Sequence, residues 1–294
     1  MNFTDQIKDS FRSGNNLMKL LYINIAVFLA VKIVGVFLFL FAVPESRFSM
    51  VDWLAVPAGI DQLLTRPWTI ITYMFYHEGF FHILFNMLWF FWFGQIFINY
   101  LNEKKLLTVY ILGGLGGAVL YILAFNAFPV FQEILPVSKA LGASASVIAV
   151  VIAISVYAPN HTINLLLFGP VKLKYIALVT IVIDILSITG ANSGGHIAHL
   201  GGALVGFLYI RQFQKGKNPA RGFEKFMDKV FSIFKPRPKF KVTHKRPMTD
   251  FEYNKEKVKK QKEVDRILEK IAKSGYDSLS KDEKETLFKQ GGKS

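Results

Sequence analysis

The chain has 294 residues, of which 52% are hydrophobic and 28 are Phe, and its mean hydropathy is positive. A soluble domain of this length does not carry so many long apolar stretches, so the composition excludes an ordinary soluble enzyme and indicates a polytopic membrane protein. The chain has no cysteine, which excludes disulfides, thiol catalysis and metal sites with Cys ligands.

Six apolar segments follow one another along the first part of the chain. They cover residues 18–43, 81–101, 105–127, 142–158, 174–190 and 194–212. Several reach the roughly 20 residues that cross a bilayer core. The fourth and fifth are short, and we interpret them as spans because they alternate with stronger neighbours. We therefore predict an all-α fold, with an N-terminal segment over 1–17 and a bundle of six transmembrane helices over 18–212.

Positive charge is concentrated after the last apolar segment. Residues 211–294 contain 24 Lys and Arg against 12 Asp and Glu, which accounts for +12 of the net charge of +14. Two shorter basic stretches lie around Lys105 and around Lys172. The positive-inside rule places all three regions in the cytoplasm, and six alternating spans satisfy this condition. Both termini are therefore expected in the cytoplasm, and the second, fourth and sixth spans enter from the outer side.

The segment before the first span is polar and lacks the features of a transit peptide. This absence favours an integral protein of a bacterial plasma (inner) membrane over a protein of an organelle.

The basic C-terminal tail divides into two predicted parts. Large apolar residues recur at helical spacing between lysines over 219–235, a pattern typical of a helix lying on an anionic leaflet. We expect 213–262 to be a basic juxtamembrane segment, first amphipathic and then disordered, and 263–294 to form a small cytoplasmic hairpin of two short helices. The expected partners are anionic lipid and an unknown cytoplasmic protein. Nucleic acid is not expected, because membrane topology already accounts for the charge.

Polar side chains occur near the start of three predicted spans. Ser144 lies at the head of the fourth span, His199 near the start of the sixth, and His82 and Asn86 in the first turns of the second. Because these spans all enter from the outer face, the four side chains are expected at similar depth. Polar groups inside hydrocarbon are costly and usually mark a functional site.

These residue types fit acyl transfer by a serine nucleophile. His199 can accept the hydroxyl proton of Ser144 and return it to a leaving amine. Backbone N–H groups at a helix N-terminus are free to face an oxyanion, and His82 and Asn86 project from one helical face toward the same oxygen. No Asp or Glu stands in an obvious position to orient His199, so the sequence predicts a serine–histidine dyad.

Small residues predict that the helices carrying the dyad approach closely. They recur along three spans: Gly113 and Gly117, then Ala145, Ala149 and Ala153, then Gly202 and Gly206. In lipid, such stripes allow helix backbones to come near one another.

The polar residues and their surroundings resemble the rhomboid intramembrane serine proteases. The resemblance is carried by residues 66–86, by Gly142-Ala-Ser144 and by Ala198-His-Leu-Gly-Gly202 with the following Gly206, and it covers about 65–212. It implies that Ser144 is the nucleophile, that His199 is its base, and that His82, Asn86 and the Ser144 backbone amide form the oxyanion hole. It also implies cleavage of transmembrane substrates in or near their membrane-spanning segments, without metal or cofactor. The expected substrates are single-span proteins, and because water must reach Ser144, the site is expected to open to the outer side.

The chain departs from the family pattern beside the nucleophile. Ala145 stands where the family often has Gly, and Ile148 stands where an aromatic ring often stacks on the catalytic histidine. Neither change removes a reacting group, so both bear on rate rather than on chemistry.

Other interpretations of the same polar residues stay open. A metal site would combine His196 and His199 with His82 or His77, and it is disfavoured because these sets lack a nearby carboxylate. Ser146 lies about 200° around the helix from Ser144, which favours a packing role.

Two ionisable residues, Asp184 and Lys32, lie within apolar spans. They are interpreted as an interhelical contact and a snorkelling side chain, with a proton or ion path as the less favoured alternative.

The alternative function is an inactive relative that binds transmembrane helices without cutting them. The presence of both Ser144 and His199 disfavours this alternative. A transporter or channel ranks third, because the sequence has no internal repeat or pair of broken helices.

Overall fold

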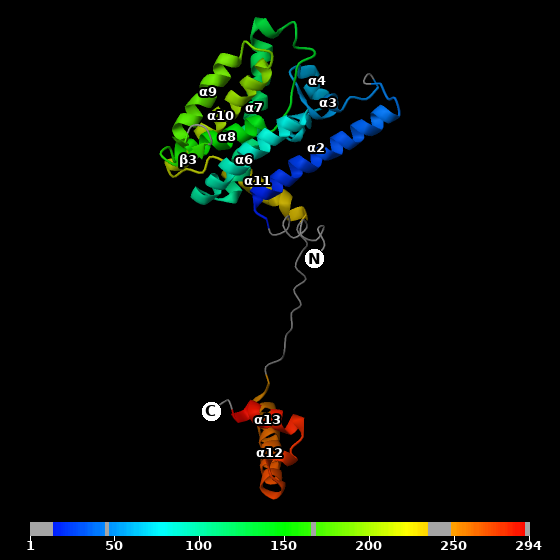
Figure 1. Ribbon diagram of the computed structural model, residues 1–294, viewed down its shortest axis with the longest axis vertical. Coiled ribbons are helices and arrows are strands. Elements are labelled where there is room, and N and C mark those ends of the chain that lie inside the picture. The colour runs from blue at the N-terminus through cyan, green and yellow to red at the C-terminus, as the bar shows by residue number, and fades with distance from the viewer. Residues whose placement is uncertain (1–13, 45–46, 166–168, 235–247, 292–294) are drawn as a thin grey trace. The chain divides into compact units, whose positions relative to one another are not determined.

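Helices occupy all six segments that the sequence predicts to span the membrane (Figure 1). The computed structural model describes residues 14–44, 47–165, 169–234 and 248–291. The six helices are α2 (Asn16–Leu40), α6 (Phe80–Tyr100), α7 (Glu103–Ala127), α8 (Ser144–Tyr157), α9 (Leu173–Ser187) and α10 (Ser193–Gln214).

Length and composition support three of the six expected spans. Among the described helices, α2, α6 and α7 are long and apolar enough to cross a membrane. Helix α8 is apolar but has 14 residues, so it rises about 21 Å against a hydrocarbon core of about 30 Å. Length and composition therefore do not identify α8, α9 and α10 as membrane spans, and their interpretation as spans rests on their position in the bundle.

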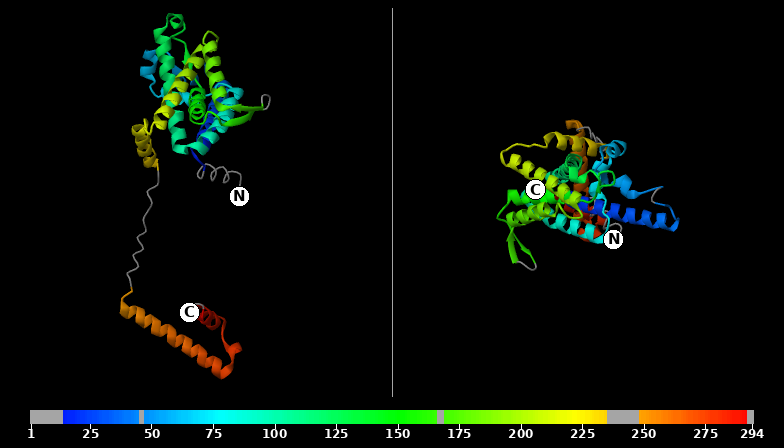
Figure 2. Two further views of the ribbon diagram at one scale, coloured as in Figure 1. Left: turned by 90° about the vertical axis from the view of Figure 1, so that its left-hand side faces the viewer. Right: turned by 90° about the horizontal axis from the view of Figure 1, so that it is seen from above.

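The structure is mostly helical, as predicted, but it is not all-α, because two short antiparallel strand pairs accompany the helices. Strand β1 (Val56–Pro57) pairs with β2 (Lys139–Ala140), and β3 (Thr162–Leu165) pairs with β4 (Gly169–Lys172). The second pair forms a hairpin that projects from the bundle between α8 and α9 (Figure 2). Strands of two to four residues are too short to leave an alternating pattern in the sequence.

Helix α8 lies at the centre of the bundle, packed against α6, α7, α9 and α10. Its residues from Ala145 to Ser155 are all buried. Small and β-branched side chains dominate this stretch, so α8 is apolar on every face, as expected of a helix enclosed by other helices.

Glycines allow α8 to approach its neighbours on both sides. A methyl group added at Gly202 or Gly206 of α10 would collide with the backbone carbonyls of Ala145 and Ala149, respectively. On the other side, methyl groups at Gly113 and Gly117 of α7 would collide with the Cβ atoms of Ala149 and Ala145. The predicted close approach of the fourth and sixth spans is therefore confirmed, and α7 takes part in it.

The connection between α2 and α6 is folded. It contains α3 (Met50–Leu54), β1, α4 (Ile60–Thr65), α5 (Thr69–Thr72) and the 3₁₀ turn η1 (Tyr73–Phe75). The Trp53 and Trp68 rings stack with centroids 5.5 Å apart, and the Arg66 guanidinium lies over Trp53. Asp52 forms an ion pair with Lys139 next to the β1–β2 pairing. These contacts fix the segment that leads into α8.

A buried histidine ties the start of α6 to the start of α8. The Nε2 atom of His77 accepts a hydrogen bond from the Ala143 N–H at 3.4 Å, and its Nδ1 lies 3.3 Å from the carbonyl oxygen of Phe75. Accepting at Nε2 and donating at Nδ1 requires the neutral ring. Burial, and next the neighbouring His82, lower the pKa of His77 from 6.5 to about 4.

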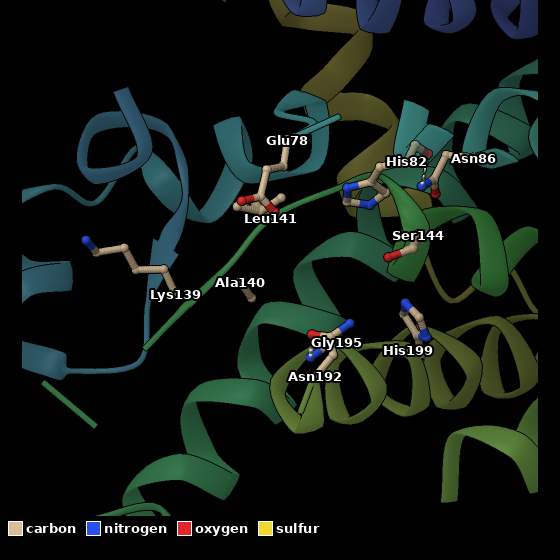
Figure 3. A pocket seen from close by; sticks show the side chains of 10 residues that line it. All are labelled: Glu78, His82, Asn86, Lys139, Ala140, Leu141, Ser144, Asn192, Gly195 and His199. Carbon is tan, nitrogen blue, oxygen red and sulfur yellow. Dashed lines mark hydrogen bonds between the residues drawn. The ribbon is translucent and has the colours of Figure 1, made fainter. Parts of the chain in front are cut away.

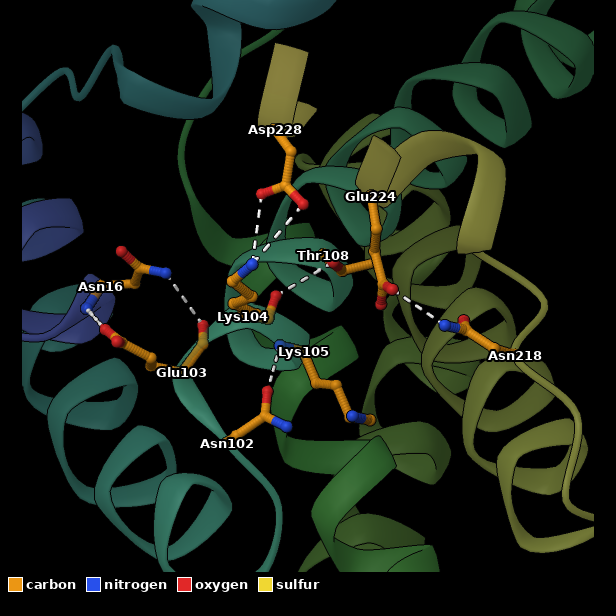
Figure 4. A network of polar contacts seen from close by, with 9 residues as sticks. All are labelled: Asn16, Asn102, Glu103, Lys104, Lys105, Thr108, Asn218, Glu224 and Asp228. Atoms are coloured by element: carbon orange, nitrogen blue, oxygen red, sulfur yellow. Dashed lines mark hydrogen bonds and ion pairs between the residues drawn. The ribbon is translucent and has the colours of Figure 1, made fainter. Parts of the chain in front are cut away.

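Polar contacts on one side of the bundle join the starts of α2 and α7 to each other and α7 to the middle of α11, which covers Arg221–Phe234 (Figure 4). The backbone N–H of Asn16 in α2 donates to Glu103 of α7 at 2.7 Å, and Lys104 of α7 pairs with Asp228 of α11 at 3.3 Å. The side chain of Asn102 caps α7 by accepting from the Lys105 N–H. The start of α7 therefore lies beside both the start of α2 and α11.

A second compact unit lies within the C-terminal residues 235–294. Within it, α12 (Asp250–Ser274) is followed by the turn η3 (Tyr276–Ser278) and by α13 (Lys281–Gly291). Thr249 and Glu252 form a capping box, so α12 begins at Asp250 and not at 263, where the hairpin was expected to begin. The predicted disordered stretch falls partly within α12 and partly outside the described residues.

Replacing Gly202 by Val should destabilise the bundle by about 1–3 kcal/mol, because the new side chain must displace the Ala145 backbone. Thermal unfolding in detergent micelles measures this effect. Gly222→Val is the matched control, since a Cβ at Gly222 of α11 meets nothing within 4 Å. Equal stability of the two variants would contradict the close approach of α8 and α10.

Acidification should destabilise the fold through His77. Its pKa of about 4 in the fold lies below the ordinary 6.5, so the unfolded chain takes up a proton first as pH falls. Stability is therefore lost between pH 6.5 and about 4, by on the order of 3 kcal/mol. Melting temperatures across this range should fall less steeply for His77→Gln, and identical slopes for the two proteins would refute the assignment.

Candidate active site

A cavity of about 440 Å³ opens between the N-terminal ends of α6, α8 and α10 (Figure 3). It is lined by Glu78, His82, Asn86, Lys139, Ala140, Leu141, Ser144, Asn192, Gly195 and His199. The four side chains selected from the sequence are among them, although they come from three helices. In Figure 3, the Ser144 hydroxyl lies between the rings of His82 and His199.

The turn before Ser144 depends on Gly142. This residue has a φ of +114°, a left-handed conformation that L side chains rarely adopt. A Cβ at Gly142 would also lie 2.7 Å from Nε2 of His82. The glycine therefore allows the His82 ring to lie directly against the turn. Helix α8 begins at Ser144, so the backbone N–H groups of its first turn lack partners within the helix.

His82 and Asn86 occupy one face of α6, as their spacing predicts. Asn86 donates from Nδ2 to the carbonyl oxygen of His82 at 2.8 Å, which restrains the orientation of its amide. The His82 ring makes an edge contact with His77, with centroids 5.1 Å apart. His77 thus contacts His82 and also the Ala143 N–H that precedes Ser144.

His199 is held by a buried carboxylate from the neighbouring helix. Its Nδ1 lies 2.8 Å from Oδ1 of Asp184 in α9, and Nδ1 of His196 lies at the same distance from the same oxygen. The Asp184 side chain is 6% exposed. An ionised carboxylate only accepts hydrogen bonds, so both imidazoles donate from Nδ1. The lone pair of His199 is then on Nε2.

The expectation that His199 has no acidic partner is therefore wrong. Asp184 was interpreted from the sequence as an interhelical contact, which it is, but its partner was not identified. The sequence signal for this pairing was the negative charge of Asp184 within an apolar segment, because a carboxylate buried among apolar side chains needs hydrogen-bonding partners. The metal-site interpretation was disfavoured because its histidines lacked a nearby carboxylate. Asp184 supplies that carboxylate, since potential ligand atoms of Asp184, His196 and His199 lie within 4.8 Å of one another.

Two further residues named from the sequence lie away from the cavity. Ser146 is fully buried near Gly114, and its hydroxyl has no hydrogen-bond partner within the described part of the chain. Ile148 packs in an aliphatic cluster with Ala177 of α9 and Ala203 of α10. Ile148 thus helps to hold together the two helices that carry Asp184 and His199.

Lys32 reaches from α2 to the segment before α6. Its ammonium group donates to the Glu78 carbonyl oxygen at 2.6 Å and lies over the Phe28 ring.

Comparison with known proteins identifies two families. Residues 64–215 match the rhomboid domain, and residues 249–289 match a family of unknown function (DUF6576). The second match covers α12 and most of α13.

Individual relatives agree with the first match. The chain is 33% identical over 161 residues to RHOMBOID-like protein 12, mitochondrial, of Arabidopsis thaliana, an alignment that covers 52% of this chain and 48% of the relative. It is 28% identical over 164 residues to Rhomboid-like protein 16, chloroplastic, of the same plant, covering 52% and 51%. It is 26% identical over 196 residues to Rhomboid protease GlpG of Yersinia pseudotuberculosis, covering 66% and 64%.

The chain spans about half the length of the two plant relatives. The three names indicate a mitochondrion, a chloroplast and a bacterium, so they share no single compartment. The rhomboid match covers more than half of the chain and contains every residue of the cavity. The chain therefore belongs to the rhomboid family and is an integral membrane protein.

Proposed function

We propose that this chain is an intramembrane serine endopeptidase that hydrolyses peptide bonds in or near the transmembrane segments of single-span proteins. The observation that carries the proposal is the meeting of Ser144 and His199 in one cavity with His82 and Asn86. A hydroxyl, an imidazole and hydrogen-bond donors around one space are the requirements for acyl transfer.

In the proposed mechanism, the Ser144 hydroxyl attacks the carbonyl carbon of the scissile bond. Nε2 of His199 accepts the hydroxyl proton and passes it to the leaving amine. The oxyanion is stabilised by the Ser144 backbone N–H, the His82 imidazole and the Asn86 amide. Water then attacks the acyl-enzyme, and His199 serves as base a second time. No step requires a metal or a cofactor.

Asp184 gives His199 the tautomer that this mechanism needs. By accepting from Nδ1 at 2.8 Å, its carboxylate keeps the proton off Nε2 and stabilises the imidazolium that forms during attack. Asp184 does not reach the cavity and is a positioning residue. The proposed unit therefore has three members rather than the two expected from the sequence.

We propose that all six helices span the bilayer, with both termini in the cytoplasm. Large apolar side chains of α2 and α9 are exposed, among them Ile33, Phe37, Val179, Ile183 and Leu186, which suits contact with lipid and not with water. The contacts of the start of α7 with the start of α2 and with α11 agree with a common cytoplasmic side. The cavity then faces the outer side, from which water can reach it.

The remaining sequence predictions stand as proposals. Helix α11 lies on the anionic cytoplasmic leaflet, and the α12–α13 unit binds an unknown cytoplasmic partner. A bacterial plasma membrane stays a prediction, since the relatives come from different compartments.

Wild-type protein in proteoliposomes should cleave single-span substrates, whereas Ser144→Ala and His199→Ala should each lose at least about 10³-fold in rate. Ser146→Ala is the matched control, because Ser146 is buried away from the cavity and its replacement should leave cleavage intact. Product formation is followed by gel electrophoresis and mass spectrometry. A folded wild type that binds substrates but cleaves none of them would favour the inactive helix-binding relative.

Asp184→Asn should lower kcat by about 10²- to 10⁴-fold with little change in KM, because the Asn amide can donate to Nδ1 and hold the His199 proton on Nε2, and because the charge that stabilises the imidazolium is lost. Thr180→Val is the control, since this substitution removes from the same helix a hydroxyl that donates to the Ile176 carbonyl. A purely structural role for Asp184 would instead lower the melting temperature and leave kcat unchanged in the folded fraction.

A further inference from the structure

Two imidazoles converge on one carboxylate oxygen between α9 and α10. His196 and His199 are one helical turn apart, so both rings face α9. Each Nδ1 atom lies 2.8 Å from Oδ1 of Asp184, and the two ring planes are nearly perpendicular, at 83°. Three potential ligand atoms from two neighbouring helices thus lie within 4.8 Å of one another.

We propose that Asp184, His196 and His199 bind a divalent transition-metal cation of the zinc type, and that the bound cation blocks the peptidase. Imidazole nitrogen and carboxylate oxygen are the ligands that such cations prefer, and three protein ligands leave a fourth tetrahedral position for water. Calcium and magnesium, which take six or more ligands that are mainly oxygens, do not fit this set. The blocking part of the inference rests on the proposed function.

His196 is the residue that the peptidase mechanism does not use. One imidazole on Asp184 suffices to set the tautomer of His199, yet a second is present on the same oxygen. The side chains of His196 and His199 are 22% and 17% exposed, and His199 lines the cavity. Both imidazoles are therefore partly exposed, and His199 can be approached from the cavity.

The imidazoles must move to accommodate the cation. Ligand atoms about 2.0–2.1 Å from a tetrahedral zinc are roughly 3.3 Å apart, whereas each Nδ1 now lies 2.8 Å from Oδ1 and the ligand atoms of the cluster lie within 4.8 Å of one another. Each imidazole would withdraw from the carboxylate by about half an ångström, and the two imidazoles would turn toward each other.

Metal binding would block catalysis by relocating a proton. A cation on Nδ1 of His199 takes the lone pair of that atom, so the neutral ring must carry its proton on Nε2. The proton leaves Nδ1 for solvent, and Nε2 takes one up, so the ring stays neutral. An Nε2 that already carries a proton cannot accept the one on Ser144.

Binding is tested first, without reference to proteolysis. Isothermal titration of the full-length Ser144→Ala protein in nanodiscs with Zn²⁺ should give one equivalent bound. Adding His196→Gln or Asp184→Asn should weaken binding at least tenfold. Adding His161→Gln should leave it unchanged, since His161 bonds to Tyr100 outside the cluster. Absence of stoichiometric binding, or equal binding by the His196→Gln protein, would overturn the metal site.

Inhibition is tested on the active protein. Zn²⁺ should reduce cleavage by the wild type at least tenfold, and Mg²⁺ should not. His196→Gln should keep its basal rate and lose the zinc sensitivity. Zinc binding through the cluster in a chain that cleaves nothing would refute the proposed function and leave the site intact. Active enzyme that binds no zinc would refute the site alone.

Discussion

The arrangement of this protein depends on the close contact of α8 with α7 and α10. Helices in lipid gain little from burying apolar surface against one another, so close packing of backbones must hold them together. Gly202 and Gly206 admit the carbonyls of Ala145 and Ala149, and α8 is enclosed along its length. Because Ser144 is the first residue of α8 and His199 lies one turn before Gly202, the contact that stabilises the bundle also brings the two side chains to one cavity.

The polar groups around this contact form hydrogen bonds within the apolar bundle. His77 bonds to the backbone on both sides, Asn86 bonds to its own helix, and Asp184 accepts from two histidines. A buried group without a partner costs about 1–3 kcal/mol, and more when it is charged. The same bonds fix the orientation of each ring and amide, so satisfying the buried groups and preorganising the site are one requirement.

The helices and the cavity residues could be predicted from the sequence because their signals are local. Apolar runs gave the positions of the helices, and polar residues near the starts of alternate runs pointed to the side on which Ser144 and His199 meet. The pairing of Asp184 with His199 depends on how the α9–α10 connection folds back, which spacing does not reveal. The β1–β2 pair is too short to show a periodic pattern in the sequence. The lysines near the start of α12 suggested disorder, but the capping box and the Glu256–Lys260 ion pair support a helix there.

One proton position connects the proposed chemistry with the proposed metal site. With Asp184 accepting from Nδ1, the lone pair of His199 is on Nε2, where a nucleophile needs it. A cation that binds Nδ1 moves the proton to Nε2, so His199 can no longer act as the base. His196 adds a second imidazole at the atom that controls this choice. A carboxylate that orients a base inside a membrane thereby also makes that base open to control by a cation, without any change in the fold.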